Sequence, residues 1–191
     1  SADRIKGVVT CVAGIRFNES RYISDNPYTF KELIESAQFM KFNVLTQVEH
    51  YGRKISKDTV DWWRDQPKKV QEQLIEPSDN DVPLSQIIMF FQNLIRHEDT
   101  ISNVYTRGNT FDPIFVDYIF VDLKEKRPYP FWKDRDTRSM IDGLTYGTDI
   151  KNSFIVPGLE NVFSAHDPRH DIAMDIMRMQ YVVRLLNDLE V

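Results

Sequence analysis

The heptapeptide AHDPRHD, residues 165–171, begins the most distinctive segment of the chain. Pro168 suits the first position of a helix, because the N–H that proline lacks has no helical partner there. Asp167 then falls at the N-cap, where its side chain can accept a backbone N–H. In that register His166 precedes the cap and Asp171 is the fourth helical residue, two positions that meet across a helix start. The sequence therefore predicts a histidine and a carboxylate side by side where a helix begins.

Strand-like and helical patterns alternate along the rest of the chain. Residues 7–17 (GVVTCVAGIRF) are rich in β-branched side chains and short enough to form a strand. We expect extended segments at 7–17, 39–48, 101–106 and 129–132. We expect helices at 28–38, 57–66, 84–96, 114–123, 134–144 and 167–189. This alternation predicts an α/β fold with a mixed sheet and flanking helices.

Length and composition narrow the class of protein. A chain of 191 residues predicts one domain, 1–191, with a proper core. No apolar run has the length of a membrane span, and the lone Cys11 cannot form an internal disulfide, so we expect a cytoplasmic protein without a membrane partner. The net charge of -5 argues against non-specific duplex binding through a broad basic face. An acidic cleft that holds divalent cations can nevertheless accept phosphates.

Three side chains next to predicted helix starts are candidates for chemistry: Asp112, His166 and Asp171. Carboxylates are hard oxygen ligands that suit Mg²⁺ or Mn²⁺. Two such ions, about 3.5–4 Å apart, can stabilise both the attacking and the leaving oxygen of a phosphodiester. A histidine beside them can take the proton from the attacking water. The pattern favours metal-dependent phosphodiester cleavage.

Simpler interpretations of the same residues remain open. Asp112 precedes a proline and can act as a helix cap with no other role. Asp171 and Asp175 can lie in the first turns of a helix because its dipole favours acidic side chains there. His166 and His170 can be ordinary surface residues. A further alternative is an unrelated metal hydrolase that uses His166, His170 and Asp171, although cysteine-free acidic surroundings do not favour zinc.

Four segments, taken in order, carry a resemblance to a known family. They are ISKDTVDWW at 55–63, RGNTFD at 107–112, FWKDRDTR at 131–138 and AHDPRHD at 165–171. Together they make the chain similar to the DEDDh family of 3′–5′ exonucleases, and within it to the phage exodeoxyribonuclease and RNase AS group. Their order and spacing match over nearly the whole chain.

The resemblance implies an RNase H-like fold, with a five-stranded mixed β-sheet flanked by helices on both sides. It also implies a site for two metal ions made by an Asp-x-Glu pair on the first strand, a middle Asp, and a final His and Asp. Asp112 matches the middle metal ligand and Asp171 the last one. His166 matches the general base.

The implied activity is removal of nucleotides from the 3′ end of single-stranded DNA or RNA with two Mg²⁺ or Mn²⁺ ions. Asn109, Phe111 and Arg135 lie close to these motifs and are candidates for contacts with the 3′-terminal nucleotide. The apolar run 87–91 permits a homodimer. A phage-encoded protein of this kind would work in the cytoplasm of its host.

One feature of the family is not found where it is expected. No Asp-x-Glu pair lies between residues 1 and 17, and residues 7–17 resemble the strand that follows it. Loss of the first strand would leave its neighbours with unpaired backbone groups, at about 1–3 kcal/mol each. We therefore expect an upstream segment to supply the missing strand and both carboxylates.

The missing pair also favours a second hypothesis, a non-catalytic nucleic-acid-binding or scaffold protein that keeps the exonuclease fold. Retention of Asp112, His166 and Asp171 argues against it, since a protein without catalysis has no need for that set. The exonuclease remains the first interpretation.

Overall fold

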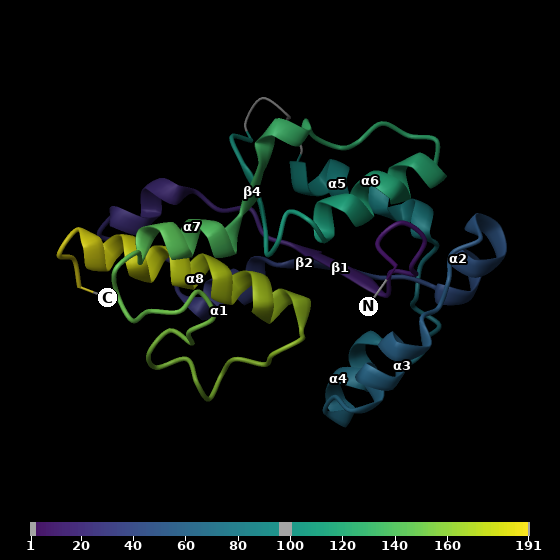
Figure 1. Ribbon diagram of the computed structural model, residues 1–191, viewed down its shortest axis with the longest axis horizontal. Helices are drawn as coiled ribbons and strands as arrows, with labels where there is room; N and C mark the ends of the chain where they lie inside the picture. Colours follow the sequence, from purple (N-terminus) through teal and green to yellow (C-terminus); the bar gives the residue numbers. More distant parts are fainter. Residues whose placement is uncertain (1–2, 96–100, 191) are drawn as a thin grey trace. The chain divides into compact units, whose positions relative to one another are not determined.

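The computed structural model describes residues 3–95 and 101–190 (Figure 1). The chain divides into two compact units, each made from three stretches of sequence. The first unit comprises Ser1–Val12, Phe39–Ser102 and Thr110–Trp132. The second comprises Ala13–Gln38, Asn103–Asn109 and Lys133–Val191.

The second unit is built around α8 (Pro168–Leu186), the predicted C-terminal helix. It packs against α1 (Phe30–Ser36), α7 (Thr137–Leu144) and the 3₁₀ turn η1 (Glu19–Ile23) (Figure 1). The apolar faces of these helices bury a common core. Its fully buried members include Leu33, Ile141, Ala173, Met174 and Met179.

Two short parallel strands complete the second unit. β3 (Val104–Thr106) pairs with β4 (Asp134–Asp136), and Tyr105 lies opposite Arg135. The prediction of a helix from residue 134 is therefore wrong for its first three residues. Asp136 ends the strand and caps α7 by accepting the N–H of Arg138, so the aspartate sets the boundary between strand and helix.

Helices form most of the first unit. They are α2 (Val44–Tyr51), α3 (Lys57–Arg64), α4 (Lys68–Leu74), α5 (Ile87–Ile95) and α6 (Asp112–Asp122), with the 3₁₀ turns η2 (Leu84–Gln86) and η4 (Phe131–Lys133). α3 begins after Ser56, as predicted, because the Ser56 hydroxyl accepts the N–H of Thr59. The expected helix 84–96 is η2 followed by α5, and residue 96 lies outside the described residues.

Two predicted extended segments differ from the structure, one in part and one throughout. Residues 39–48 are not one strand: β2 (Gln38–Lys41) is followed at once by α2. The Asn43 side chain accepts the N–H of Thr46 and starts the helix, which overrides the alternating apolar pattern. Residues 129–132 run into the turn η4 instead of forming a strand. The sequence did not predict α4, because its N-cap, Pro67, has no side chain that can form a capping hydrogen bond.

The strands of the described residues form two separate two-stranded sheets, β1–β2 and β3–β4. β1 (Cys11–Gly14) is much shorter than the strand expected at 7–17. The single mixed sheet that we expected is thus not present in the described part of the chain. A sheet of only two strands is marginally stable by itself, so the packing of helices contributes most of the stability.

A buried arginine ties the N-terminal segment to α6 in the first unit. Arg53 donates from Nη1 to the carbonyl of Gly7 at 2.7 Å, and its Nη2 lies 2.9 Å from Asp122. Burial lowers the pKa of Arg53, and the Asp122 carboxylate opposes that change. Gly7 is required here because a Cβ would lie 2.4 Å from the carbonyl oxygen of Asp3.

The apolar run 87–91 is largely buried, with Met89 exposed, and the homodimer stays a prediction. Ile87, Phe90 and Phe91 are all buried within the protein. Phe91 packs edge-on against Phe120 of α6, with ring centroids 5.8 Å apart. No helix between residues 3 and 95 or 101 and 190 is long and apolar enough to cross a membrane.

A buried carboxylate joins three elements of the second unit. Asp175 on α8 accepts hydrogen bonds from Arg107, which follows β3, and from Arg178, both at 2.7 Å. It also accepts the hydroxyl of Thr137, the first residue of α7, at 2.6 Å. Because Asp175 and Arg178 are both nearly inaccessible, each depends on the other for compensation of its charge.

We predict that Asp175→Ala lowers the free energy of unfolding by about 3–5 kcal/mol, since it leaves Arg178 buried without its carboxylate. The matched control is Asp61→Ala, which breaks an exposed Asp–Arg pair with Arg64, also on one helix. That change should cost less than about 1 kcal/mol. Urea denaturation at pH 7 measures both, and equal losses would contradict the assigned role of Asp175.

Candidate active site

His166 and Asp171 lie together at the start of α8, as the sequence predicts. Asp167 is the N-cap and accepts the N–H of Arg169 at 3.0 Å. Pro168 is the first residue of the helix, which places Asp171 fourth. The Asp171 carboxylate accepts a hydrogen bond from the backbone N–H of His166. The cap thus folds the residue before the helix back over its first turn.

The backbone of His166 adopts an unusual conformation. Its φ is 70°, in the left-handed region that most residues with a side chain avoid. Its imidazole is exposed to solvent. Strain of this kind persists only where the surroundings impose it, and it is concentrated at functional sites. The hydrogen bond from His166 to Asp171 is one such constraint.

Two aspartates of this helix start have opposite electrostatics. Partial burial raises the pKa of Asp171, although the N–H and the nearby charge of His166 act against the increase. Burial also acts to raise the pKa of Asp167, but hydrogen bonds from Arg169 outweigh it and leave this pKa lowered. Arg169 reaches both carboxylate oxygens of Asp167, at 2.9 and 2.6 Å. Asp167 is therefore a satisfied structural anion, whereas Asp171 is an incompletely compensated one.

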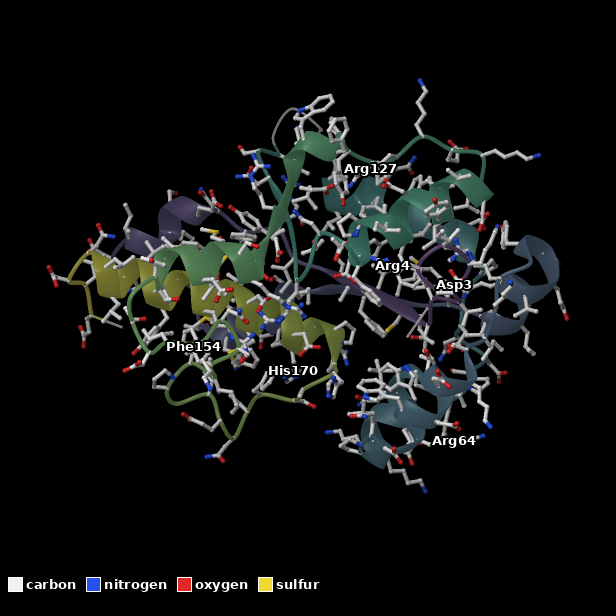
Figure 2. All side chains as sticks on the ribbon, in the orientation of Figure 1. Asp3, Arg4, Arg64, Arg127, Phe154 and His170 are labelled. Atoms are coloured by element: carbon white, nitrogen blue, oxygen red, sulfur yellow. The ribbon has the colours of Figure 1, made fainter. Side chains whose placement is uncertain are left out.

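His170 has a different role from His166. His170 lies at the start of α8 (Figure 2). Its Nδ1 accepts the backbone N–H of Ser164 at 3.1 Å, and its ring lies edge-on to Phe30 at 5.5 Å. This bond occupies the lone pair of Nδ1 and leaves the ring proton of the neutral imidazole on Nε2, so neither nitrogen offers a lone pair to a metal ion. The described residues also contain no group of three or more His, Cys, Asp or Glu side chains placed to hold one. Both observations argue against a hydrolase that uses His170 as a ligand.

An open pocket of about 420 Å³ lies in the second unit where β3 and β4 end. Its lining consists of Tyr105, Asn109, Asp134, Arg135, Asp136, Ser139 and Met140. In α/β proteins, ligands bind at the carboxyl ends of parallel strands, because loops and helix starts converge there. Asn109 and Arg135, which we named from proximity to motifs, lie in this one pocket.

Hydrogen bonds hold the polar lining of the pocket in place. Asp136 accepts the N–H of Gly108 at 3.1 Å and the hydroxyl of Ser139 at 3.1 Å. The Thr106 hydroxyl donates to the Asn109 side chain at 3.3 Å. Gly108 has a φ of 110°, which favours glycine and turns the chain from β3 into the pocket wall. No pattern in the sequence indicated that Gly108 would form this turn.

Tyr105 forms an aromatic wall of the pocket. Its hydroxyl donates to the Glu19 carboxylate, and its ring packs at 5.7 Å from that of Phe17. Partial burial raises the pKa of Tyr105, and the Glu19 carboxylate adds to the increase, so the phenol stays protonated. The sequence carries no motif signal for this residue, since its position depends on the pairing of β3 with β4.

The Asp175 network connects this pocket to the start of α8. Arg107 and Thr137 both bind Asp175. Arg107 precedes Gly108, whose N–H binds Asp136, and Thr137 follows Asp136, which lines the pocket. Asp175 and Asp171 are one helical turn apart, about 6 Å along α8. The Asp171 carboxylate and the pocket are therefore parts of one region of the second unit.

Asp112 and Phe111 belong to the first unit. Asp112 is the first residue of α6 and is exposed, while the N-cap is Phe111, which has no capping side chain. The alternative in which Asp112 serves as the cap is therefore wrong. The Phe111 ring packs on Phe115 at 5.1 Å and is 44% exposed. Convergence of Asp112 and Phe111 with His166 and Asp171 stays a prediction.

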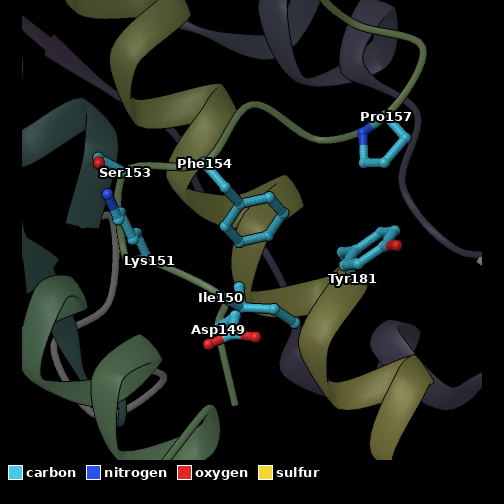
Figure 3. Close-up of a pocket in the computed structure, with 7 residues that line it drawn as sticks. All are labelled: Asp149, Ile150, Lys151, Ser153, Phe154, Pro157 and Tyr181. Atoms are coloured by element: carbon cyan, nitrogen blue, oxygen red, sulfur yellow. The ribbon is translucent and has the colours of Figure 1, made fainter.

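A second pocket lies farther along α8 (Figure 3). Phe154 and Tyr181 face each other there, with ring centroids 5.5 Å apart. Arg178 holds this loop by donating to the Phe154 carbonyl at 2.5 Å. Tyr181 follows Asp171 by ten residues, or about 15 Å of helix, so this pocket is separate from the helix start.

We predict opposite effects on stability from two substitutions at this helix start. Ionised Asp171 is disfavoured in the fold because its pKa is raised, so Asp171→Asn should increase the free energy of unfolding at pH 7, by about 0.5–2 kcal/mol. Asp167 has a lowered pKa and stabilises the fold when ionised, so Asp167→Asn should decrease it.

Denaturation curves at pH 7 and pH 3 test both signs. The effects should shrink as the pH falls below the ordinary aspartate pKa of 3.8, because protonation then removes the charges that the substitutions remove. A destabilised Asp171→Asn protein at pH 7 would contradict the description of Asp171 as an uncompensated carboxylate.

Comparison with known proteins gives the family. Residues 10–171 match the model of the 3′-5′ exoribonuclease Rv2179c-like domain. The chain is also 31% identical over 201 residues to the exodeoxyribonuclease of Enterobacteria phage T4, an alignment that covers 97% of this chain and 86% of the phage protein. No solved structure matches it. The chain therefore belongs to the Rv2179c-like exonuclease family and is a DEDDh-type exonuclease related to the phage enzyme.

Proposed function

We propose that this nuclease removes nucleotides one at a time from the 3′ end of single-stranded DNA or RNA. The observation that carries the proposal is the pairing of His166 with Asp171 at the start of α8, one helical turn from the network that borders the pocket. A base, an acidic group and a nucleotide-sized pocket are the parts that phosphodiester hydrolysis needs.

The pocket would bind the 3′-terminal nucleotide. The exposed Arg135 guanidinium can form two hydrogen bonds with a phosphate. The exposed Asn109 amide can pair with the edge of a base, and the Tyr105 ring with Met140 gives an apolar surface for the base or sugar. We propose Phe111 as a further contact of the terminal nucleotide, because its ring is partly exposed.

His166 would act as the general base. Its exposed imidazole is open to water, and a ring nitrogen would take the proton of the water that attacks the phosphorus. The hydrogen bond from its backbone to Asp171 holds the ring beside the acidic group instead of leaving it on a free loop. The leaving group is the 3′ oxygen of the preceding nucleotide.

The carboxylates of the site are suitable ligands for a divalent cation, but too few of them lie close together among the described residues to hold one. The raised pKa of Asp171 marks a carboxylate that a nearby cation would favour in its ionised form. We propose Asp171 and Asp112 as ligands for two Mg²⁺ or Mn²⁺ ions, which when bound would stabilise negative charge on the phosphate. The described residues alone do not gather enough carboxylates to complete such a site.

We propose that an Asp-x-Glu strand outside this sequence supplies the remaining carboxylates. Two separate two-stranded sheets, instead of one mixed sheet, support this because they are what remains when a strand inside a larger sheet is absent. The completed sheet would have the RNase H-like arrangement. Intact mass and N-terminal sequencing of the natural protein test the proposal, and a natural start at Ser1 would refute it.

The incomplete ligand set also favours one alternative, a binding or scaffold protein without catalysis. Titration of the natural protein with Mn²⁺ separates the two hypotheses. A nuclease should bind two ions per chain, and Asp171→Asn and Asp112→Asn should each weaken that binding. Absence of Mn²⁺ binding in the natural protein would favour the scaffold.

We predict that His166→Asn reduces turnover of a single-stranded oligonucleotide by at least about 100-fold, the effect of losing a general base. Asparagine tolerates the left-handed backbone of this position, so the unfolding midpoint should stay near that of the natural protein. His50→Asn, at an exposed histidine of α2, is the matched control and should keep full activity. Unchanged turnover in His166→Asn would exclude His166 as the base.

A further inference from the structure

We propose that His170 is a positioning residue for His166. Its imidazole holds the turn that presents His166 at the start of α8, and it does so as a hydrogen-bond acceptor. The consequence for catalysis rests on the proposed function, whereas the positioning itself does not.

The ring of His170 is fixed in one orientation. A backbone N–H can only donate, so the bond from Ser164 to Nδ1 at 3.1 Å requires an unprotonated Nδ1 and a ring proton on Nε2. Edge-on packing against Phe30 of α1, at 5.5 Å between centroids, restricts rotation of the ring. His170 is partly buried by these contacts, in contrast to the exposed His166.

The bond to His170 restrains one end of a short turn. Ser164 precedes His166 by two residues, and its carbonyl accepts the N–H of Asp167 at 3.4 Å. The other end is restrained by the bond from the His166 N–H to Asp171. Both restraints come from the first turn of α8, so the helix itself acts as the template for the turn.

The left-handed backbone of His166 makes these restraints necessary. A φ of 70° is disfavoured for a residue with a side chain, and a free turn would relax away from it. Removal of the His170 acceptor would leave the Ser164 N–H without this partner and release that relaxation. The His166 imidazole would then leave its place beside Asp171.

The substitutions His170→Leu and His170→Asn test the proposal. Leucine has a similar bulk but no acceptor, while the asparagine Oδ1 lies close to the position of the histidine Nδ1 and can accept the same N–H. His50→Leu is the matched control, because His50 is an exposed histidine of α2 that is distant from His170 in the sequence.

Amide hydrogen exchange by NMR is the first readout and needs no activity. In His170→Leu the amides of Ser164 and His166 should exchange at least about tenfold faster, while His170→Asn and the control should keep slow exchange. The ¹⁵N spectrum of the unaltered protein should show His170 with its proton on Nε2. A proton on Nδ1, or unchanged His166 exchange in a folded His170→Leu protein, would overturn the proposal.

Steady-state kinetics on a single-stranded oligonucleotide is the second readout. Misplacement of a catalytic group slows chemistry more than binding, so His170→Leu should lower kcat at least about tenfold with KM little changed, and His170→Asn should restore most of kcat. Unchanged kcat in an active His170→Leu protein would overturn the proposal. An inactive unaltered protein with the expected exchange pattern would instead contradict the proposed function and leave the positioning role supported.

Discussion

The second unit depends on the shared carboxylate of Asp175. This side chain, in the middle of α8, accepts hydrogen bonds from Arg107, which follows β3, from Thr137, the first residue of α7, and from Arg178 on α8 itself. A buried anion with two guanidinium partners and a hydroxyl is directional, whereas apolar packing is not. It therefore sets how the strand ends meet the helix, and with them the pocket and the start of α8.

The start of α8 shows how function and stability diverge over a few residues. Asp167 binds the helix N-terminus and Arg169 and is fully compensated, so it stabilises the fold. Asp171, four residues later, is partly buried and its pKa is raised, and His166 is held at a positive φ. Uncompensated charge and backbone strain gather where a substrate and its ions would bind.

Local signals in the sequence predicted helix starts well and strands poorly. Ser56 and Asp167 each cap a helix through their own side chain, as predicted, and such a bond involves only neighbouring residues. The register of His166 and Asp171 followed from Pro168 for the same reason. Strands require partners far along the chain, so the extended patterns at 39–48 and 129–132 did not show that Asn43 would start a helix or that a turn would intervene.

The sequence by itself determined the exonuclease family and the contact between His166 and Asp171, because motif order and helix capping are written in neighbouring residues. Only the tertiary structure decided that Asn109 and Arg135 line one pocket, that His170 accepts the Ser164 N–H, and that Ile87, Phe90 and Phe91 are buried. Those facts depend on strand pairing and on packing between helices distant in sequence, which no local pattern encodes.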